Sequence, residues 1–166
     1  MHSAAYLLVY LTLERGIELI VARRNTAALL ANGAYERGRR HYPAMVALHA
    51  SWLIAMWTFG WNHAIQPEWL AAFAVLQAAR GWVLVTLGRR WTTRIIVVPG
   101  EAPVTAGPYR FVRHPNYLVV ALELPCASLA VGLGWQAVLF CALNLAMLAW
   151  RIRSEDAAWA GGAATQ

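Results

Sequence analysis

The chain contains no lysine and few charged residues of any kind. Asp, Glu, Lys and Arg make up only 13% of its 166 residues, and all fourteen basic residues are Arg. Hydrophobic residues account for 60% of the sequence, and the mean hydropathy is +0.45. This composition lies outside the range of soluble globular domains, so the sequence predicts a single integral membrane domain.

The sequence also lacks the features that several other classes of protein require. Apolar segments separate the Arg clusters, and no nucleic-acid-binding motif is present, which argues against a nucleic-acid partner. Cys126 and Cys141 lie in apolar runs with no His or further Cys at metal-ligand spacing, so neither a disulfide framework nor a metal site is expected. Glu14, Arg15 and Glu18 interrupt the first apolar run, which argues against a cleavable signal peptide.

The apolar segments predict the fold. A helix needs roughly 20 mostly apolar residues to cross the hydrocarbon core of a bilayer. Five segments approach this length, so we expect an all-α membrane protein with about five transmembrane helices. The last two are short and are split only by residues 132–134, so they could be two thin spans or a tight helical hairpin. The five segments are 4–22, 43–61, 69–87, 117–133 and 135–150.

The positions of the Arg residues predict how these helices are oriented. All except Arg15 and Arg80 lie between the first and second spans, between the third and fourth spans, or after the fifth. Loops enriched in Arg face the cytoplasm in most membrane proteins. We therefore expect an external N-terminus and a cytoplasmic C-terminus.

The segment 88–116 is the longest polar stretch and is rich in Pro and Gly. A long ordered loop in so small a protein is usually functional. Gly107 and Pro108 predict a turn that lets the backbone approach a ligand closely. On composition alone, the loop could equally be an anchor that contacts lipid phosphates.

The end of this loop predicts an anion site. His114 precedes Pro115, which suits the first turn of the fourth helix, so His114 lies at a helix N-terminus. The free N–H groups of the first helical turn would face a bound anion, and Arg110 and Arg113 would strengthen the attraction.

Arg151 and Glu155 form a second candidate group at the end of the fifth span. They are four residues apart and share a helix face. A simple helical ion pair, worth only a few tenths of a kcal/mol, is one explanation. However, the hairpin returns both residues to the surface from which His114 starts, and the three groups together could bind a zwitterionic ligand.

Charged side chains inside a bilayer are costly and usually face a partner or a cavity. An ion pair between Arg80 and Glu14 or Glu18 could lock the packing of the helices, or these groups could contact a substrate. For Glu123, which lies about two and a half turns below His114 and within reach of Asn144, both roles remain open. The charged residues within the predicted spans are Glu14, Arg15, Glu18, Arg80 and Glu123.

Residues 87–156 resemble the isoprenylcysteine carboxyl methyltransferase and phospholipid methyltransferase superfamily, whose members carry a loop with GPY, RHP and Y followed by a late helix ending in Arg and Glu. The start of the family loop is matched by Leu87, Gly88, Trp91 and Thr92. The central motif is matched by Val104, Thr105, Gly107, Pro108, Tyr109, Arg113, His114, Pro115 and Tyr117. The late helix is matched by Arg151, Glu155 and, with Asp in place of the common Glu, Asp156.

The resemblance implies that S-adenosylmethionine binds at the cytoplasmic face, between the loop and the last two helices. Glu155 would take its ammonium group, His114 and Tyr117 would hold its carboxylate and nucleoside, and Arg151 would bridge Glu155 or meet the substrate. The cofactor-binding residues that the resemblance implies are Val104, Gly107, Pro108, Tyr109, Arg113, His114, Pro115, Tyr117, Arg151 and Glu155.

The resemblance further implies methyl transfer to a lipophilic acceptor that enters from the bilayer. Enzymes catalyse such a displacement mainly by proximity and alignment. A prenylcysteine carboxylate would need no base, whereas a phenol or pyrone oxygen would benefit from one, and Glu123 or His114 could serve. With Arg151, these are the expected catalytic residues. The N-terminal half resembles bacterial members, some of which methylate lipidic polyketides, so a bacterial inner membrane is expected.

The expected organisation is one methyltransferase domain. It comprises three N-terminal spans in residues 1–87, the cofactor loop and helical hairpin in 88–156, and a tail in 157–166. Two other functions remain as alternatives. One is a small multidrug exporter that uses Glu14, and the other is an NADPH-dependent membrane reductase of related architecture.

Overall fold

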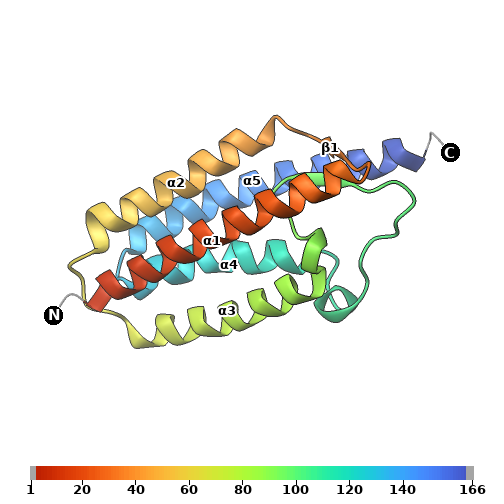
Figure 1. The fold of residues 1–166 in the computed structure, drawn as a ribbon. Helices are drawn as coiled ribbons and strands as arrows, with labels where there is room; N and C mark the ends of the chain where they lie inside the picture. The colour runs from red at the N-terminus through yellow and green to blue at the C-terminus, as the bar shows by residue number, and fades with distance from the viewer. Residues whose placement is uncertain (1–2, 164–166) are drawn as a thin grey trace.

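The computed structural model describes the backbone of residues 3–163 and the side chains of residues 4–155. Successive long helices run in opposite directions along the length of the molecule (Figure 1). The long helices are α1 (Ser3–Ala31), α2 (His41–Gly60), α3 (Pro67–Leu87), α4 (Pro115–Ala130) and α5 (Gly134–Ala163). The shorter elements are the 3₁₀ turns η1 (Gly88–Arg90) and η2 (Gly107–Arg110) and the strands β1 (Tyr35–Arg37) and β2 (Ile95–Val97).

Among the described residues, three helices have both the length and the apolar composition that crossing a membrane requires. They are His41–Gly60, Pro67–Arg90 and Gly134–Glu155. Helix α4 is apolar but has only 16 residues. Helix α1 has 29 residues and contains Glu14, Arg15 and Glu18, which lower its hydropathy. The predicted helical membrane fold is therefore confirmed, while the count of five spans remains a prediction.

The structure differs from the predicted fold in the end of the first helix and in the presence of a short β-sheet. Helix α1 continues to Ala31, well beyond residue 22, so Arg23 and Arg24 are helical. Strands β1 and β2 pair antiparallel, with Tyr35 opposite Val97. Strands of three residues are too short to produce an alternating pattern, and this pair joins segments some sixty residues apart. The pairing fixes the long loop against the connector between α1 and α2.

Helices α4 and α5 pack along each other in opposite directions and are joined by the short turn 131–133 (Figure 1). Hydrogen bonds from side chains hold α2 against this pair. Trp52 Nε1 donates to Ser128 Oγ at 3.0 Å, and Gln136 Nε2 donates to the Trp52 carbonyl at 3.1 Å. The apolar core around Trp52 contains side chains from all five long helices and lies at the end remote from the long loop.

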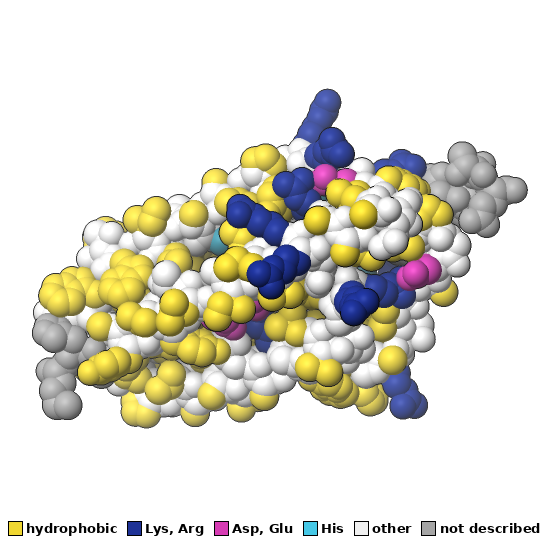
Figure 2. All heavy atoms as spheres, viewed as in Figure 1, with side chains coloured by type: hydrophobic (Ala, Val, Ile, Leu, Met, Phe, Trp, Pro, Cys, Tyr) yellow, Lys and Arg dark blue, Asp and Glu magenta, His cyan; other side chains and the backbone are white. Residues whose placement is uncertain are grey.

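Hydrophobic and basic side chains occupy different parts of the surface. Hydrophobic side chains cover much of the helical surface, and the dark blue Arg side chains gather toward the end that carries β1 and the long loop (Figure 2). Large apolar side chains such as Val85 (83% exposed) and Val138 (73% exposed) point outward from the helices. Outward apolar faces of this size fit lipid better than water, which agrees with an integral membrane protein.

Candidate functional site

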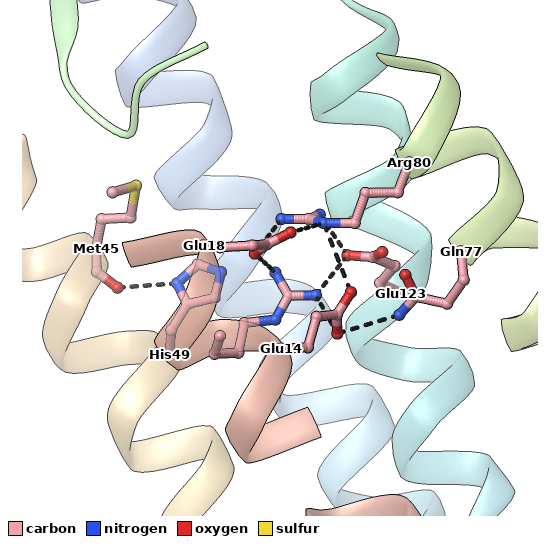
Figure 3. A network of polar contacts seen from close by, with 8 residues as sticks. Glu14, Glu18, Met45, His49, Gln77, Arg80 and Glu123 are labelled. Carbon is pink, nitrogen blue, oxygen red and sulfur yellow. Dashed lines mark hydrogen bonds and ion pairs between the residues drawn. The ribbon is translucent and has the colours of Figure 1, made fainter. Parts of the chain in front are cut away.

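A network of charged side chains lies between α1, α3 and α4 (Figure 3). Arg80 on α3 pairs with Glu18 on α1, and its Nη1 atom lies 2.7 Å from Glu123 Oε2 on α4. Arg15 on α1 lies 3.0 Å from both Glu18 and Glu123. The sequence-based interpretation of an Arg80–Glu18 pair that locks helix packing is thus confirmed. Arg80, 5% exposed, is a buried cation surrounded by carboxylates.

The structure corrects the expected contact of Asn144 and shows the partners of Glu14. Asn144 does not reach Glu123, because its Nδ2 atom donates to the Val120 carbonyl at 3.1 Å. Glu14, on which the exporter alternative depends, accepts hydrogen bonds from Arg15 at 3.3 Å and from Gln77 at 3.2 Å. Glu14 is therefore part of the network that joins the helices.

A cavity of about 410 Å³ lies beneath the long loop, and we call it the loop cavity. Its wall comes from the loop, from β2, from the start of α4 and from the end of α5. Most of the residues predicted to bind the cofactor line it. These are Val104, Tyr109, Arg113, His114, Tyr117, Arg151 and Glu155.

Tyr117 lines the loop cavity and contacts several of its other side chains. Its hydroxyl donates to Glu155 Oε2 at 2.5 Å and accepts a hydrogen bond from Arg151 Nε at 3.0 Å. The His114 ring stacks on the Tyr117 ring with centroids 5.3 Å apart. Arg151 Nη1 also donates to the Thr93 carbonyl at 2.8 Å. The structure therefore brings together the cation, the anion and the imidazole that the sequence predicted would converge, with Tyr117 joining them.

Tyr109 contributes a neutral phenol to the same cavity. Burial, reinforced by the nearby Glu155 carboxylate, raises the pKa of Tyr109 to about 12. The phenol therefore keeps its proton at physiological pH and can act as a hydrogen-bond donor inside the loop cavity.

Three predicted cofactor-binding residues do not line the loop cavity. Gly107, at φ +56°, presses against the side chain of Thr86 on α3, so its close approach serves packing of η2 on α3. Pro108 and Pro115 are buried. The sequence correctly marked these Gly and Pro residues as distinctive backbone positions. However, they are packed against other parts of the protein and do not face the loop cavity.

The start of α4 also differs from the predicted anion site. The backbone N–H groups of Tyr117 and Leu118 donate to the His114 carbonyl at 3.1 and 3.2 Å. They are therefore used within the first helical turn. An anion in the loop cavity would rely on side chains such as Arg113 more than on these backbone groups.

A second cavity of about 330 Å³ extends between the helices, and we call it the helix cavity. Its apolar wall comes mainly from Leu19, Val46, Leu53, Val120, Met147 and Leu148. Arg15, Glu18 and Arg80 form part of its wall as well. The helix cavity and the loop cavity share the wall residues Trp91, Thr92, Asn116, Tyr117 and Arg151.

Several polar groups on the helix cavity were not predicted from the sequence. Asn116 Oδ1 and Asn144 Oδ1 are buried without a hydrogen-bond partner among the described residues. His49 on α2 also lines this cavity. Asn116 could have been found, because it lies within the GPYRFVRHPNY motif. His49 gave no signal, because a single His in an apolar helix resembles a neutral packing residue.

The structure places Glu123, one of the expected catalytic residues, in the charged network. Glu123 is 1% exposed and is held by Arg15 and Arg80. It is absent from the described residues that line either cavity. A carboxylate already paired with two guanidinium groups and away from both cavities is poorly placed to receive a proton from a ligand. Glu123 is on the same helix as the loop motif, as the sequence predicted, but its side chain does not line either cavity.

The fold and site define a helical membrane protein in which a loop and the last two helices enclose one of two adjoining cavities. Residues 69–160 match the isoprenylcysteine carboxyl methyltransferase (ICMT) family, and the chain belongs to this family. Membership implies a membrane methyltransferase, as the motif residues predicted.

The chain is similar to two relatives over most of its length. The chain is 38% identical to the uncharacterized protein YpbQ of Bacillus subtilis over 92% of its own length and 94% of that protein. It is 27% identical to an uncharacterized protein of Haemophilus influenzae, covering 87% of each chain. No solved structure matches the chain.

Proposed function

We propose that the protein transfers a methyl group from S-adenosylmethionine to an oxygen atom of a lipophilic acceptor. The observation that carries this proposal is the common wall of the two cavities. A cavity under the Arg-rich loop, with Arg, His, Tyr and Glu side chains on its wall, adjoins a largely apolar cavity between the helices, with Tyr117 and Arg151 at their boundary. A charged, water-soluble methyl donor and an apolar acceptor could meet at this boundary in the in-line geometry that methyl transfer requires.

The chemistry of the loop cavity suits S-adenosylmethionine, which methyltransferases of this family generally use. The cofactor supplies an activated methyl group on a sulfonium. Glu155 would hold its ammonium group, and Arg113 with His114 would hold its carboxylate. Ile95 and Val97 on β2 offer an apolar surface for the nucleoside. The volume of about 410 Å³ lies within the roughly 300–1,000 Å³ usual for small-molecule sites.

The helix cavity suits the acceptor. Its apolar wall would hold a hydrocarbon chain, and its boundary with the loop cavity would hold the reacting oxygen. Arg151, whose guanidinium contacts the Tyr117 hydroxyl, would meet the polar head of the acceptor. The candidate acceptors are a lipidic phenol or pyrone oxygen and a prenylcysteine-type carboxylate. A membrane lipid or a lipidic small molecule is thus the expected partner.

The distribution of Arg supports a topology in which the loop faces the cytoplasm. The exposed Arg residues of the connector between α1 and α2 and of the long loop lie at one end of the helices (Figure 2). The positive-inside rule then places the loop cavity, the C-terminus and the soluble cofactor in the cytoplasm of a bacterial cell. The acceptor would enter from the inner membrane.

Transfer of a labelled methyl group tests this proposal. Purified protein in detergent would be incubated with S-[methyl-³H]adenosylmethionine and long-chain phenol, pyrone or prenylcysteine acceptors. Label that passes into the organic phase with one of these acceptors supports the proposal. If none of them is labelled while the protein remains folded, the proposed acceptor class is wrong.

A further inference from the structure

His49 on α2 is held by the backbone in one protonation pattern. Its Nδ1 atom lies 2.9 Å from the Met45 carbonyl oxygen, one helical turn earlier. A carbonyl oxygen only accepts hydrogen bonds, so Nδ1 carries the proton. In the neutral ring the other nitrogen, Nε2, then has a free lone pair. Figure 3 shows this second nitrogen on the side of Glu18, away from Met45.

The surroundings of His49 are those of the proposed acceptor site. His49 lines the helix cavity, whose wall also contains Tyr117 and Arg151 from the boundary with the loop cavity. Met45, one turn away on the same helix, accepts a hydrogen bond from Arg151 at its sulfur atom. His49 therefore lies one helical turn from a residue that contacts Arg151 at the boundary of the two cavities.

Charged and titratable groups face the helix cavity from every long helix. They are Arg15 and Glu18 on α1, Tyr42 on α2, Arg80 on α3, Tyr117 on α4 and Arg151 on α5. Glu18 is engaged by Arg15 and Arg80, so the carboxylate on this wall is already paired. The guanidinium groups on this wall belong to Arg15, Arg80 and Arg151. A neutral base therefore faces an apolar cavity that has cations around it.

We propose that Nε2 of His49 accepts the proton of a hydroxyl group on the acceptor during methyl transfer. The proposal rests on the proposed function and narrows its acceptor to a phenol or enol lipid, because a carboxylate has no proton to give at neutral pH. It assigns to His49 the role of base that the sequence suggested for Glu123 or His114.

The step balances in atoms and charge. The acceptor oxygen forms a bond to the methyl carbon, and the carbon–sulfur bond breaks with its electron pair left on sulfur. The acceptor's O–H bond breaks, and the proton moves to Nε2, giving an imidazolium. The positive charge of the sulfonium disappears as the positive charge of the imidazolium forms. The site therefore passes through the reaction without a change in net charge.

The test compares His49→Gln with His63→Gln. His63 makes the same contact, from Nδ1 to a backbone carbonyl, that of Val131 at 2.9 Å, but lies next to the turn at the opposite end of α4. Two acceptors of equal chain length would be used: an alkylphenol, and a nitro-substituted alkylphenol that is already ionised at the assay pH.

For the alkylphenol, we expect His49→Gln to lower kcat on the order of 10²-fold, the usual scale of general-base catalysis. For the ionised analogue we expect kcat within about threefold of the wild type, because no proton remains to be removed. His63→Gln should match the wild type with both acceptors. An equal loss with both acceptors, or no loss with either, would overturn the proposal.

A second readout does not depend on turnover. With S-adenosylhomocysteine bound, the nitro-substituted acceptor would be titrated by its phenolate absorbance. A neutral Nε2 that accepts a hydrogen bond from the phenol O–H stabilises the protonated phenol, so the apparent pKa of the bound phenol should be higher in the wild type than in His49→Gln, and equal values contradict the proposal. If instead wild-type protein methylates the prenylcysteine carboxylate but neither phenol, His49 is excluded as the base while methyltransferase activity stands. Failure of the wild type with every acceptor counts against the proposed function itself.

Discussion

The hydroxyl of Tyr117 on α4 donates a hydrogen bond to the carboxylate of Glu155 on α5, with the two oxygen atoms 2.5 Å apart. Arg151 donates to the same hydroxyl from one turn earlier on α5. Arg151 and Glu155 are thus linked through a phenol, although their spacing of four residues suggested a direct ion pair. This arrangement orients two opposite charges on the wall of the loop cavity.

Tyr117→Phe should weaken binding of S-adenosylhomocysteine. The substitution keeps the ring that stacks on His114 but removes the hydroxyl that orients Glu155. Loss of one charge-assisted hydrogen bond corresponds to about a tenfold increase in Kd. Isothermal titration calorimetry would measure this, with Tyr6→Phe as the control, because Tyr6 is 81% exposed on α1. An unchanged Kd for Tyr117→Phe would show that the hydroxyl does not support the cofactor site.

Arg80→Gln should strongly destabilise the protein. Arg80 is 5% exposed and contacts Glu18 and Glu123, so its removal leaves buried carboxylates without a full set of partners. Breaking a buried ion pair by removing one partner typically costs about 3–5 kcal/mol. Thermal unfolding in detergent would show a lower Tm than for the wild type and for Arg89→Gln, which changes an exposed Arg. Equal Tm values would mean that the network contributes little to stability.

The sequence predicted those parts of the fold and site that have a local signature. Apolar runs located the helices, and the spacing of Arg151 and Glu155, with the motif around His114, located the loop cavity. The Arg80–Glu18 pair could be anticipated because isolated charges in apolar helices need partners. The β1–β2 pairing could not, because three-residue strands carry no periodicity and their partners lie far apart in the sequence.

Glu123→Gln separates the sequence-based hypothesis from the structural one. If Glu123 were the base, turnover of a phenolic acceptor would fall roughly 10²-fold or more while the Tm stayed near that of the wild type. The structure, in which Glu123 pairs with Arg15 and Arg80, predicts a lower Tm instead. Turnover by the folded fraction should stay within about threefold of the wild type. A large loss of turnover at unchanged Tm would restore the catalytic role of Glu123.

Glu123 and His49 show why access is hard to read from sequence. Glu123 was a candidate because it is an intramembrane carboxylate near the loop motif, yet Arg15 and Arg80 on two other helices pair with it. His49 was not a candidate because it is a single His on an apolar helix, yet its side chain lines a cavity formed by all the long helices. Which face of a helix meets a cavity depends on packing between distant segments, and periodicity within one segment does not specify it.

The predicted membrane topology can be tested with single cysteines at Thr105 and Gln66, both of which are exposed. The natural Cys126 and Cys141 would first be replaced by Ala. A membrane-impermeant thiol reagent added to intact cells should label position 66 and should label position 105 only after the membrane is opened. Labelling of position 66 from the cytoplasmic side alone would show that the predicted orientation is inverted.

The central claim, a methyltransferase with its cofactor in the loop cavity, is tested most directly by calorimetric titration of purified wild-type protein with S-adenosylhomocysteine and with NADPH. We predict that S-adenosylhomocysteine binds without added metal and that NADPH does not bind. Glu155→Gln should weaken S-adenosylhomocysteine binding more than Asp156→Asn does, the side chain of Asp156 lying outside the described residues. NADPH binding without S-adenosylhomocysteine binding, or equal affinity in Glu155→Gln and the wild type, would contradict the account.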